Sequence, residues 1–155
     1  MSTKNVHENL ADHMAITDLV NRYTSAGNRR DWAALADTFA EDGVWKAIAP
    51  DGQLRHHAGR ENVANALGAL VEGMAMMVQF NHAVVIRVEG DHGRVVSTME
   101  EYFSYPDGGP AMHAIGTYSD EVVRCADGEW RFAKRHFSPI YYEARAFPGT
   151  LAARH

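Results

Sequence analysis

The sequence predicts an α+β domain in which a bent β-sheet covers helices from the first half of the chain. Apolar residues recur at helical spacing in three segments of that half, with a short hairpin between the second and third. From Phe80 onward, segments rich in β-branched residues are separated by turn signals. Because the helices precede these strands instead of alternating with them, the pattern favours α+β over α/β.

The composition is that of one globular domain. The chain has 155 residues, of which 46% are apolar and 23% charged, and its net charge is −5. The negative charge argues against nucleic acid or an anionic membrane as the main partner. No apolar run approaches the ~18 residues of a membrane span, and the start of the chain lacks a signal-peptide core. With Cys125 as the single cysteine, we expect no disulfide framework and a cytoplasmic location.

The first half of the chain is expected to hold three helices. The first begins at Leu10 and ends at residues 27–28, a Gly-Asn pair that tolerates the left-handed conformation. Asp31 is the expected N-cap of the second helix, whose apolar face extends to Phe39 and which ends at residues 42–43.

A hairpin and the third helix follow. The hairpin pairs residues 44–49 with residues 53–57 across a Pro-Asp-Gly turn. The third helix opens at Gly59, and its apolar stripe continues to Met77 and Val78.

The second half predicts a four-strand antiparallel meander over residues 80–89, 94–105, 111–124 and 129–138. We therefore expect a flexible N-terminus over residues 1–9 and a domain over residues 10–140. The tail, residues 141–155, contains Tyr141, Tyr142 and Phe147 and is expected to pack on the body or on a partner subunit. A bent sheet closed over helices leaves a pocket between the two layers, where small ligands commonly bind.

His82 is the first candidate for chemistry. Strict alternation places it on one face of its strand with Val84, Ile86 and Val88, which predicts an imidazole that faces the pocket. A bulge between Gln79 and Val84 would turn it away. The alternative to a functional role is a core histidine satisfied by a hydrogen bond.

Two candidates come from the first helix. Tyr23 lies on its core stripe, so its hydroxyl either donates to a substrate oxygen or finds a partner within the core. Asn28 lies at the helix exit and is either a turn former or a polar group that orients a ligand.

The meander supplies two more candidates. Glu101 shares the more apolar face of its strand with Met99 and Phe103, where burial would raise its pKa and a histidine could pair with it; otherwise it points to solvent. His113 lies near the start of the next strand, whose inward face the alternation leaves ambiguous.

The candidate pocket residues are large and apolar, and the same residues would also make an ordinary core. No convincing metal-ligand spacing, phosphate-binding loop or nucleophile elbow is present, so we expect no metal and no cofactor. General acid–base chemistry by histidine, tyrosine and a carboxylate remains. The expected lining residues are Trp45, Phe80, Met99, Phe103 and Trp130.

The chain resembles the SnoaL-like branch of the nuclear-transport-factor-2-like superfamily, which includes scytalone dehydratase and ketosteroid isomerase. The resemblance implies a cone-shaped α+β barrel, in which a strongly bent mixed sheet wraps around about three helices. It also implies a homodimer or homotrimer. It is carried by residues 15–23, 31–35, 39–43 and 59–61, and by Gly116–Asp120 together with Asp127–Phe132.

The resemblance also implies roles for the candidates. In dehydratase-like members, a histidine on the first strand of the meander pairs with an aspartate after the first helix, and a helix tyrosine assists. The tyrosine matches Tyr23, and the aspartate position matches Asn28, an amide that cannot serve as a carboxylate base. The histidine position falls at Gln79 or His82, depending on the bulge. Glu101 and His113 lie close to a carboxylate and a histidine of other members.

Our hypothesis from the sequence is a cofactor-independent lyase of the dehydratase type, or an isomerase, for a small hydrophobic, aromatic, polyketide-like or steroid-like substrate. His82 would be the base, Tyr23 and His113 would donate hydrogen bonds to an oxyanion, and Glu101 would fix a histidine tautomer. The rival hypothesis is a ligand-binding or accessory domain of the same fold that catalyses nothing.

Overall fold

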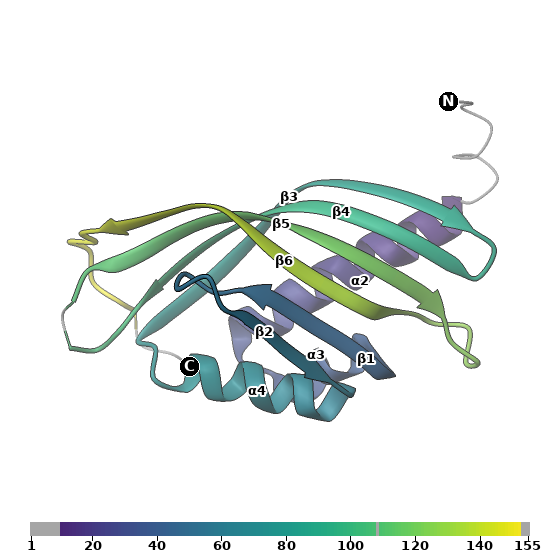
Figure 1. Ribbon diagram of the computed structural model, residues 1–155, viewed down its shortest axis with the longest axis horizontal. Coiled ribbons are helices and arrows are strands. Elements are labelled where there is room, and N and C mark those ends of the chain that lie inside the picture. Colours follow the sequence, from purple (N-terminus) through teal and green to yellow (C-terminus); the bar gives the residue numbers. More distant parts are fainter. Residues whose placement is uncertain (1–9, 108, 153–155) are drawn as a thin grey trace.

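The computed structural model describes residues 10–107 and 109–152, and it confirms the predicted α+β class. Three helices gather on one side of a curved sheet (Figure 1). They are α2 (Leu10–Arg29), α3 (Trp32–Asp37) and α4 (Arg60–Glu72). The expected flexible segment, residues 1–9, and residues 153–155 of the tail lie outside the described residues. No helix in the described part is long and apolar enough to cross a membrane.

The sheet has six strands in the order β2-β1-β6-β5-β4-β3 and is not closed into a complete barrel. The predicted meander is present as four antiparallel neighbours, and β1 pairs with β6 in parallel, so the sheet is mixed. The strands are β1 (Phe39–Ile48), β2 (Leu54–Ala58), β3 (Met76–Glu89), β4 (His92–Ser104), β5 (Ala111–Arg124) and β6 (Trp130–Arg145).

The second helix is shorter than predicted. It ends at Asp37, where Thr38 turns its hydroxyl back to the carbonyl oxygen of Leu35 at 2.6 Å. Phe39 is fully buried, as the apolar spacing indicated, but it belongs to β1 and pairs with Phe132 of β6. The pairing with β6 therefore overrides the helical periodicity at this point.

Two other element boundaries also differ from the predicted ones. The third helix stops at Glu72, and Gly73 follows as its C-cap, so Met77 lies in β3 and not on the helix stripe. The last strand continues past Ser138 to Arg145, because it pairs with β5 as far as Ala111. Alternating burial in a strand and periodic burial in a helix look alike over such short apolar runs.

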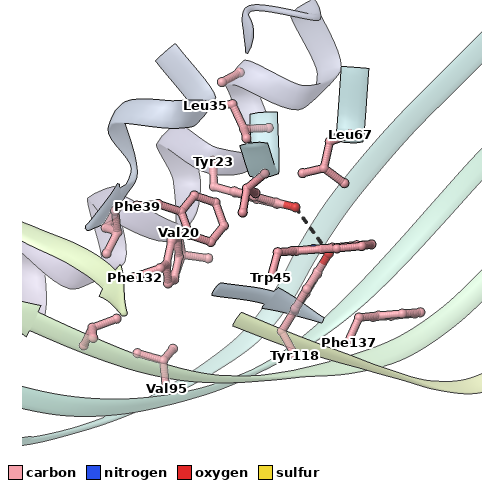
Figure 2. Close-up of a cluster of buried hydrophobic side chains, with 14 of the residues drawn as sticks. Val20, Tyr23, Leu35, Phe39, Trp45, Leu67, Val95, Tyr118, Phe132 and Phe137 are labelled. Carbon is pink, nitrogen blue, oxygen red and sulfur yellow. Dashed lines mark hydrogen bonds between the residues drawn. The ribbon is translucent and has the colours of Figure 1, made fainter. Parts of the chain in front are cut away.

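The core lies between the helices and the inner face of the sheet, where aromatic rings meet edge to face (Figure 2). The Tyr23 ring lies 6.0 Å from the Phe39 ring and 5.9 Å from the Phe132 ring, measured between centroids. These contacts anchor the C-terminal half of α2 on β1 and β6, and so fix the position of the Tyr23 hydroxyl.

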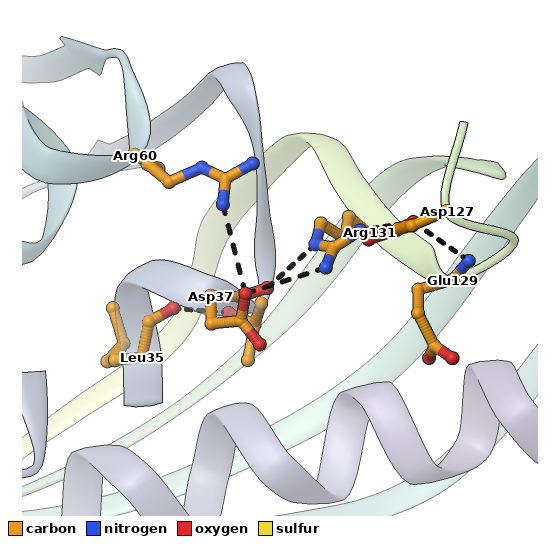
Figure 3. Close-up of polar contacts among 7 residues, drawn as sticks. Leu35, Asp37, Arg60, Asp127, Glu129 and Arg131 are labelled. Atoms are coloured by element: carbon orange, nitrogen blue, oxygen red, sulfur yellow. Dashed lines mark hydrogen bonds and ion pairs between the residues drawn. The ribbon is translucent and has the colours of Figure 1, made fainter. Parts of the chain in front are cut away.

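Polar contacts hold the end of α3 against the sheet (Figure 3). Asp37 Oδ1 lies 3.8 Å from Arg60 Nη1 of α4 and 3.5 Å from Arg131 Nη2 of β6. Arg131 also donates to the carbonyl oxygen of Asp37 at 3.1 Å and pairs with Asp127 at 2.8 Å. One acidic residue thus joins two helices and the last strand.

Candidate functional site

A cavity of about 200 Å³ lies between the helices and the inner face of the sheet. Its lining side chains come from all three helices and from all six strands, so the curvature of the sheet creates the space. Most of the lining is apolar, which favours a ligand that is itself largely apolar. The larger apolar lining residues are Trp32, Leu35, Trp45, Leu67, Val71, Met74, Met77, Met99, Phe103 and Phe137.

A small set of polar side chains faces this apolar space. Tyr23 of α2 and Tyr118 of β5 bring their hydroxyl oxygens to 3.5 Å from each other (Figure 2). Glu101 of β4 and Gln79 of β3 line the same cavity, and so does Tyr142 of β6. A carboxyl group and phenolic hydroxyls around one apolar cavity can accept a proton from a ligand and donate hydrogen bonds to it.

Glu101 is the only carboxylic acid among the cavity-lining residues that the structure describes. Alternation along β4 places it on the inner face with Met99 and Phe103, which is one of the two orientations that the sequence left open. Burial raises the pKa of its carboxyl group, and a hydrogen bond from the side-chain amide of Gln79 acts in the opposite direction. The expectation that a histidine pairs with Glu101 is wrong, because its hydrogen-bond partner is the Gln79 amide.

The two buried tyrosines remain hydrogen-bond donors. Burial raises the pKa of both phenols, most strongly that of Tyr23. The guanidinium carbon of Arg135 lies 4.1 Å from the ring centroid of Tyr23 and 3.8 Å from that of Tyr118. Its positive charge lowers both pKa values, which makes the hydroxyls stronger donors than burial alone would leave them.

Arg135 itself is fully buried behind these rings. Its side chain and that of Asp120 have no exposed surface, and Arg135 Nη1 lies 3.4 Å from Asp120 Oδ2. Burial raises the pKa of Asp120 to about 7, although the charge of Arg135 acts to lower it. Among the described residues, no guanidinium nitrogen of Arg135 has a hydrogen-bond partner, so the ring contacts and the Asp120 ion pair compensate only in part for its lost hydration.

His82 does not face the cavity, so the predicted orientation is wrong. The pairing of β3 with β4 shifts between Asn81 and Val84, and this bulge turns His82 to the outer face of the sheet. Its side chain is 50% exposed and its Nε2 lies 2.9 Å from Glu100 Oε2. Such a bulge is the alternative to strict alternation that the sequence left open, but no residue in this segment indicates its position.

His113 also lies on the outer face. It pairs in register with Tyr102, whereas its neighbour Ala114 pairs with Glu101 and lines the cavity. His113 Nε2 lies 2.8 Å from Glu100 Oε1, and its ring stacks on that of Tyr102 at 4.5 Å. Hydrogen bonds from Tyr102, His82 and His113 lower the pKa of Glu100 to about 2. The two histidines therefore join strands on the face opposite the cavity.

Asn28 pairs with the backbone of the neighbouring strand. Its Nδ2 donates to the carbonyl oxygen of Gln79 at 2.9 Å, and its Oδ1 accepts from the Gln79 N–H at 2.8 Å. It is not among the cavity-lining residues. Asn28 orients the strand that carries Gln79, so of the two roles left open by the sequence, the one that orients a ligand in the cavity does not apply.

Three of the five predicted lining residues do line the cavity: Trp45, Met99 and Phe103. Phe80 is 47% exposed and rests edge-on against Tyr102, 6.4 Å between centroids, on the outer face. Trp130 is buried away from the cavity, where its indole nitrogen donates to Asp12 at 3.1 Å.

Sequence reasoning missed Tyr118 and Arg135. A signal for Tyr118 was present, because Ala114, Gly116 and Tyr118 share one face of their strand and small residues leave room for a neighbouring ring. A Cβ at Gly116 would lie 2.2 Å from the Phe137 ring, so this close approach requires glycine. Nothing in the sequence indicates that Arg135 is buried, since arginine is normally exposed.

A model of the SnoaL-like domain family matches residues 8–136 of the chain. No curated protein matches. Among solved structures, the chain is similar to a scytalone dehydratase-like protein from Novosphingobium aromaticivorans DSM 12444, with 23% identity, 90% and 91% of the two chains covered, and a TM-score of 0.77.

It is also similar to the hexachlorocyclohexane dehydrochlorinase LinA-type3 from Novosphingobium barchaimii LL02. There the identity is 18%, the coverage 94% of this chain and 97% of the other, and the TM-score 0.81. At these identities the likeness shows a shared fold.

Proposed function

Because the chain belongs to the SnoaL-like domain family, we propose that it is a lyase of the dehydratase type, or an isomerase, that acts on a small hydrophobic ring compound. Two of the similar structures are named for a dehydratase and a dehydrochlorinase, and both names denote eliminations. The observation that carries the proposal is the placement of Glu101, a carboxyl group of raised pKa, in an apolar cavity with Tyr23 and Tyr118.

Glu101 is the general base of this reaction. A carboxylate of raised pKa is a stronger proton acceptor than an exposed one, and the apolar cavity keeps water from competing. Glu101 takes a proton from the carbon next to a carbonyl group, and the electron pair of that C–H bond moves toward the carbonyl oxygen. Tyr23 and Tyr118 donate hydrogen bonds to the oxyanion that forms.

This intermediate can react in two ways. In an elimination, the electron pair returns to form a C=C bond, and the leaving group departs from the next carbon with its bonding electrons. The proton held by Glu101 passes to the leaving group, which is released as water or as an acid. In an isomerisation, Glu101 returns the proton to a different carbon. The roles first expected of His82 and His113 do not enter, because both imidazoles lie on the other face of the sheet.

The size of the cavity limits the substrate. A cavity of about 150 Å³ accepts benzene, and the present one measures about 200 Å³. A single six-membered ring with one or two substituents therefore fits the space better than a steroid does.

The test compares two adjacent carboxylates. Glu101→Gln removes the proposed base, whereas Glu100→Gln makes the same change on the outer face. Proton abstraction is followed by NMR as exchange of the α-hydrogens of cyclohexanone in D2O, and elimination as the conversion of 3-hydroxycyclohexanone to the conjugated enone. We expect Glu101→Gln to slow both by roughly 10²- to 10⁴-fold, and Glu100→Gln to match the wild type.

Circular dichroism is used to check that both variants are folded. Equal rates for the wild type and a folded Glu101→Gln variant would contradict the proposal. Saturable binding of cyclohexanone without any proton exchange would instead support a binding domain that catalyses nothing.

A further inference from the structure

Arg55 is the only cationic side chain among the described residues that line the cavity. It lies on edge strand β2, opposite Ala47 of β1, which also lines the cavity. The other solvent-exposed lining residues include Pro50, Leu70 and Tyr105. These four residues mark the mouth of the cavity, between the β1–β2 turn, α4 and the β4–β5 turn.

Arg55 has no partner of its own within the described part of the chain. Most of the other arginines there face a carboxylate, as Arg60 and Arg131 face Asp37 and Arg124 faces Asp12. An arginine at the rim of an apolar cavity, with its donors unused, is available to a ligand. Its planar fork of N–H groups matches a carboxylate through two parallel hydrogen bonds.

Glu101 lines the same cavity from another part of the sheet. Strands β1, β6 and β5 lie between β2, which carries Arg55, and β4, which carries Glu101. A substrate anion held by Arg55 therefore stays away from the carboxyl group that must accept a proton. The ring of the substrate then fills the apolar space between them.

We propose that the substrate is a small ring carboxylic acid whose carboxylate binds Arg55 at the mouth while its reacting carbon lies toward Glu101. This inference rests on the proposed function in taking the cavity as the substrate site and Glu101 as the group that reacts. It adds a specificity-determining residue and a substrate class. Arg55 selects the anion, and the apolar walls select a ring of limited size.

The test measures binding without turnover. Benzoate and benzamide have nearly the same shape but differ in charge, and their dissociation constants are measured by NMR titration with the full chain. Arg55→Gln removes the cation, and Arg55→Lys keeps the charge without the fork. Lys46→Gln, on β1 but outside the cavity lining, is the matched control for the loss of one positive charge.

We expect the wild type to bind benzoate more tightly than benzamide, and Arg55→Gln to weaken benzoate binding about tenfold or more without changing benzamide binding. Arg55→Lys should retain part of the preference, and Lys46→Gln all of it. No saturable binding of benzoate, equal affinity for the two ligands, or an equal loss in Lys46→Gln would overturn the inference.

The outcomes separate this inference from the proposed function. Benzoate binding that depends on Arg55, in a protein that exchanges no α-hydrogens, would contradict the enzyme and keep the specificity. Exchange that depends on Glu101, without a preference for anions, would support the proposed enzyme and contradict the specificity for a carboxylate.

Discussion

The side-chain amide of Gln79 donates a hydrogen bond to Oε2 of Glu101, and the two residues face each other in register across β3 and β4. This hydrogen bond stabilises the ionised form of Glu101. Burial disfavours the ionised form, and so it raises the pKa of the carboxyl group. The balance between the two decides the pH at which Glu101 can act as a base.

This balance predicts the acid limb of the pH–rate profile. Since the active form of Glu101 is the carboxylate, kcat/KM should fall as the pH drops through the raised pKa of this group. Gln79→Leu removes the donor that holds the pKa down, so the acid limb should move to higher pH. The measurement is kcat/KM for the exchange of cyclohexanone α-hydrogens between pH 4 and pH 9.

Gln53→Leu is the control for this prediction, because Gln53 lies in the exposed β1–β2 turn. Its profile should match that of the wild type. An acid limb that stays in place, or moves to lower pH, in Gln79→Leu would show that Glu101 is not the base that titrates.

Asn28 predicts a different effect, on stability. Its amide uses both a donor and an acceptor on the backbone of Gln79. Asn28→Asp keeps the acceptor but places a carboxylate oxygen against the Gln79 carbonyl oxygen. We expect the free energy of unfolding at pH 7 to fall by about 1–3 kcal/mol, measured by urea denaturation.

The loss should shrink at pH 4, because protonation of the new carboxyl group restores a donor to the carbonyl oxygen. Asn62→Asp is the matched control, since the Asn62 amide donates to the Ala58 carbonyl oxygen at 3.2 Å in an exposed position. An equal loss in both variants, or no dependence on pH, would count against the backbone pairing of Asn28.

The sequence predicted the α+β class and offered the inner position of Glu101 as one of two alternatives, because both depend on regular spacing. Periodic apolar residues identify the helices, and simple alternation along β4 places Met99, Glu101 and Phe103 on one face. No irregularity interrupts the pairing of this stretch of β4 with β5, so counting in twos gives the correct face.

The same rule failed at His82, because one bulge between Asn81 and Val84 reverses the face of every residue on one side of it. A bulge depends on the neighbouring strand and not on the residues that form it, and so the sequence alone cannot place it. Arg135 was missed for a related reason. Its burial depends on three aromatic rings and Asp120, which come together only in the folded sheet.

Arg135 also gives the last prediction. Arg135→Met replaces the guanidinium with a flexible apolar side chain and leaves Asp120 buried without a counter-charge. When both groups are ionised, breaking a buried ion pair in this way typically costs about 3–5 kcal/mol. We expect a loss of up to that order in urea denaturation at pH 9, which lies above the Asp120 pKa of about 7. Arg22→Met is the control, because the exposed Arg22–Asp18 pair at 2.8 Å should contribute at most about 1 kcal/mol.

The pH dependence of this loss has a definite sign. The pKa of Asp120 is raised to about 7 from an ordinary value of 3.8, so the folded state loses stability as the pH rises from about 4 to 7. Without Arg135 the pKa of Asp120 rises further, and the fall in stability should extend to higher pH. The loss in Arg135→Met should therefore be smaller at pH 5, where Asp120 is protonated.

The double variant Arg135→Met with Asp120→Asn separates lost packing from the stranded charge. If the unpaired carboxyl group causes the loss, the double variant should recover part of the stability at pH 9 and show a weaker dependence on pH. A double variant no more stable than Arg135→Met would assign the loss to the contacts of the guanidinium with Tyr23, Tyr118 and Phe132. A single variant as stable as Arg22→Met would show that the buried pair contributes nothing.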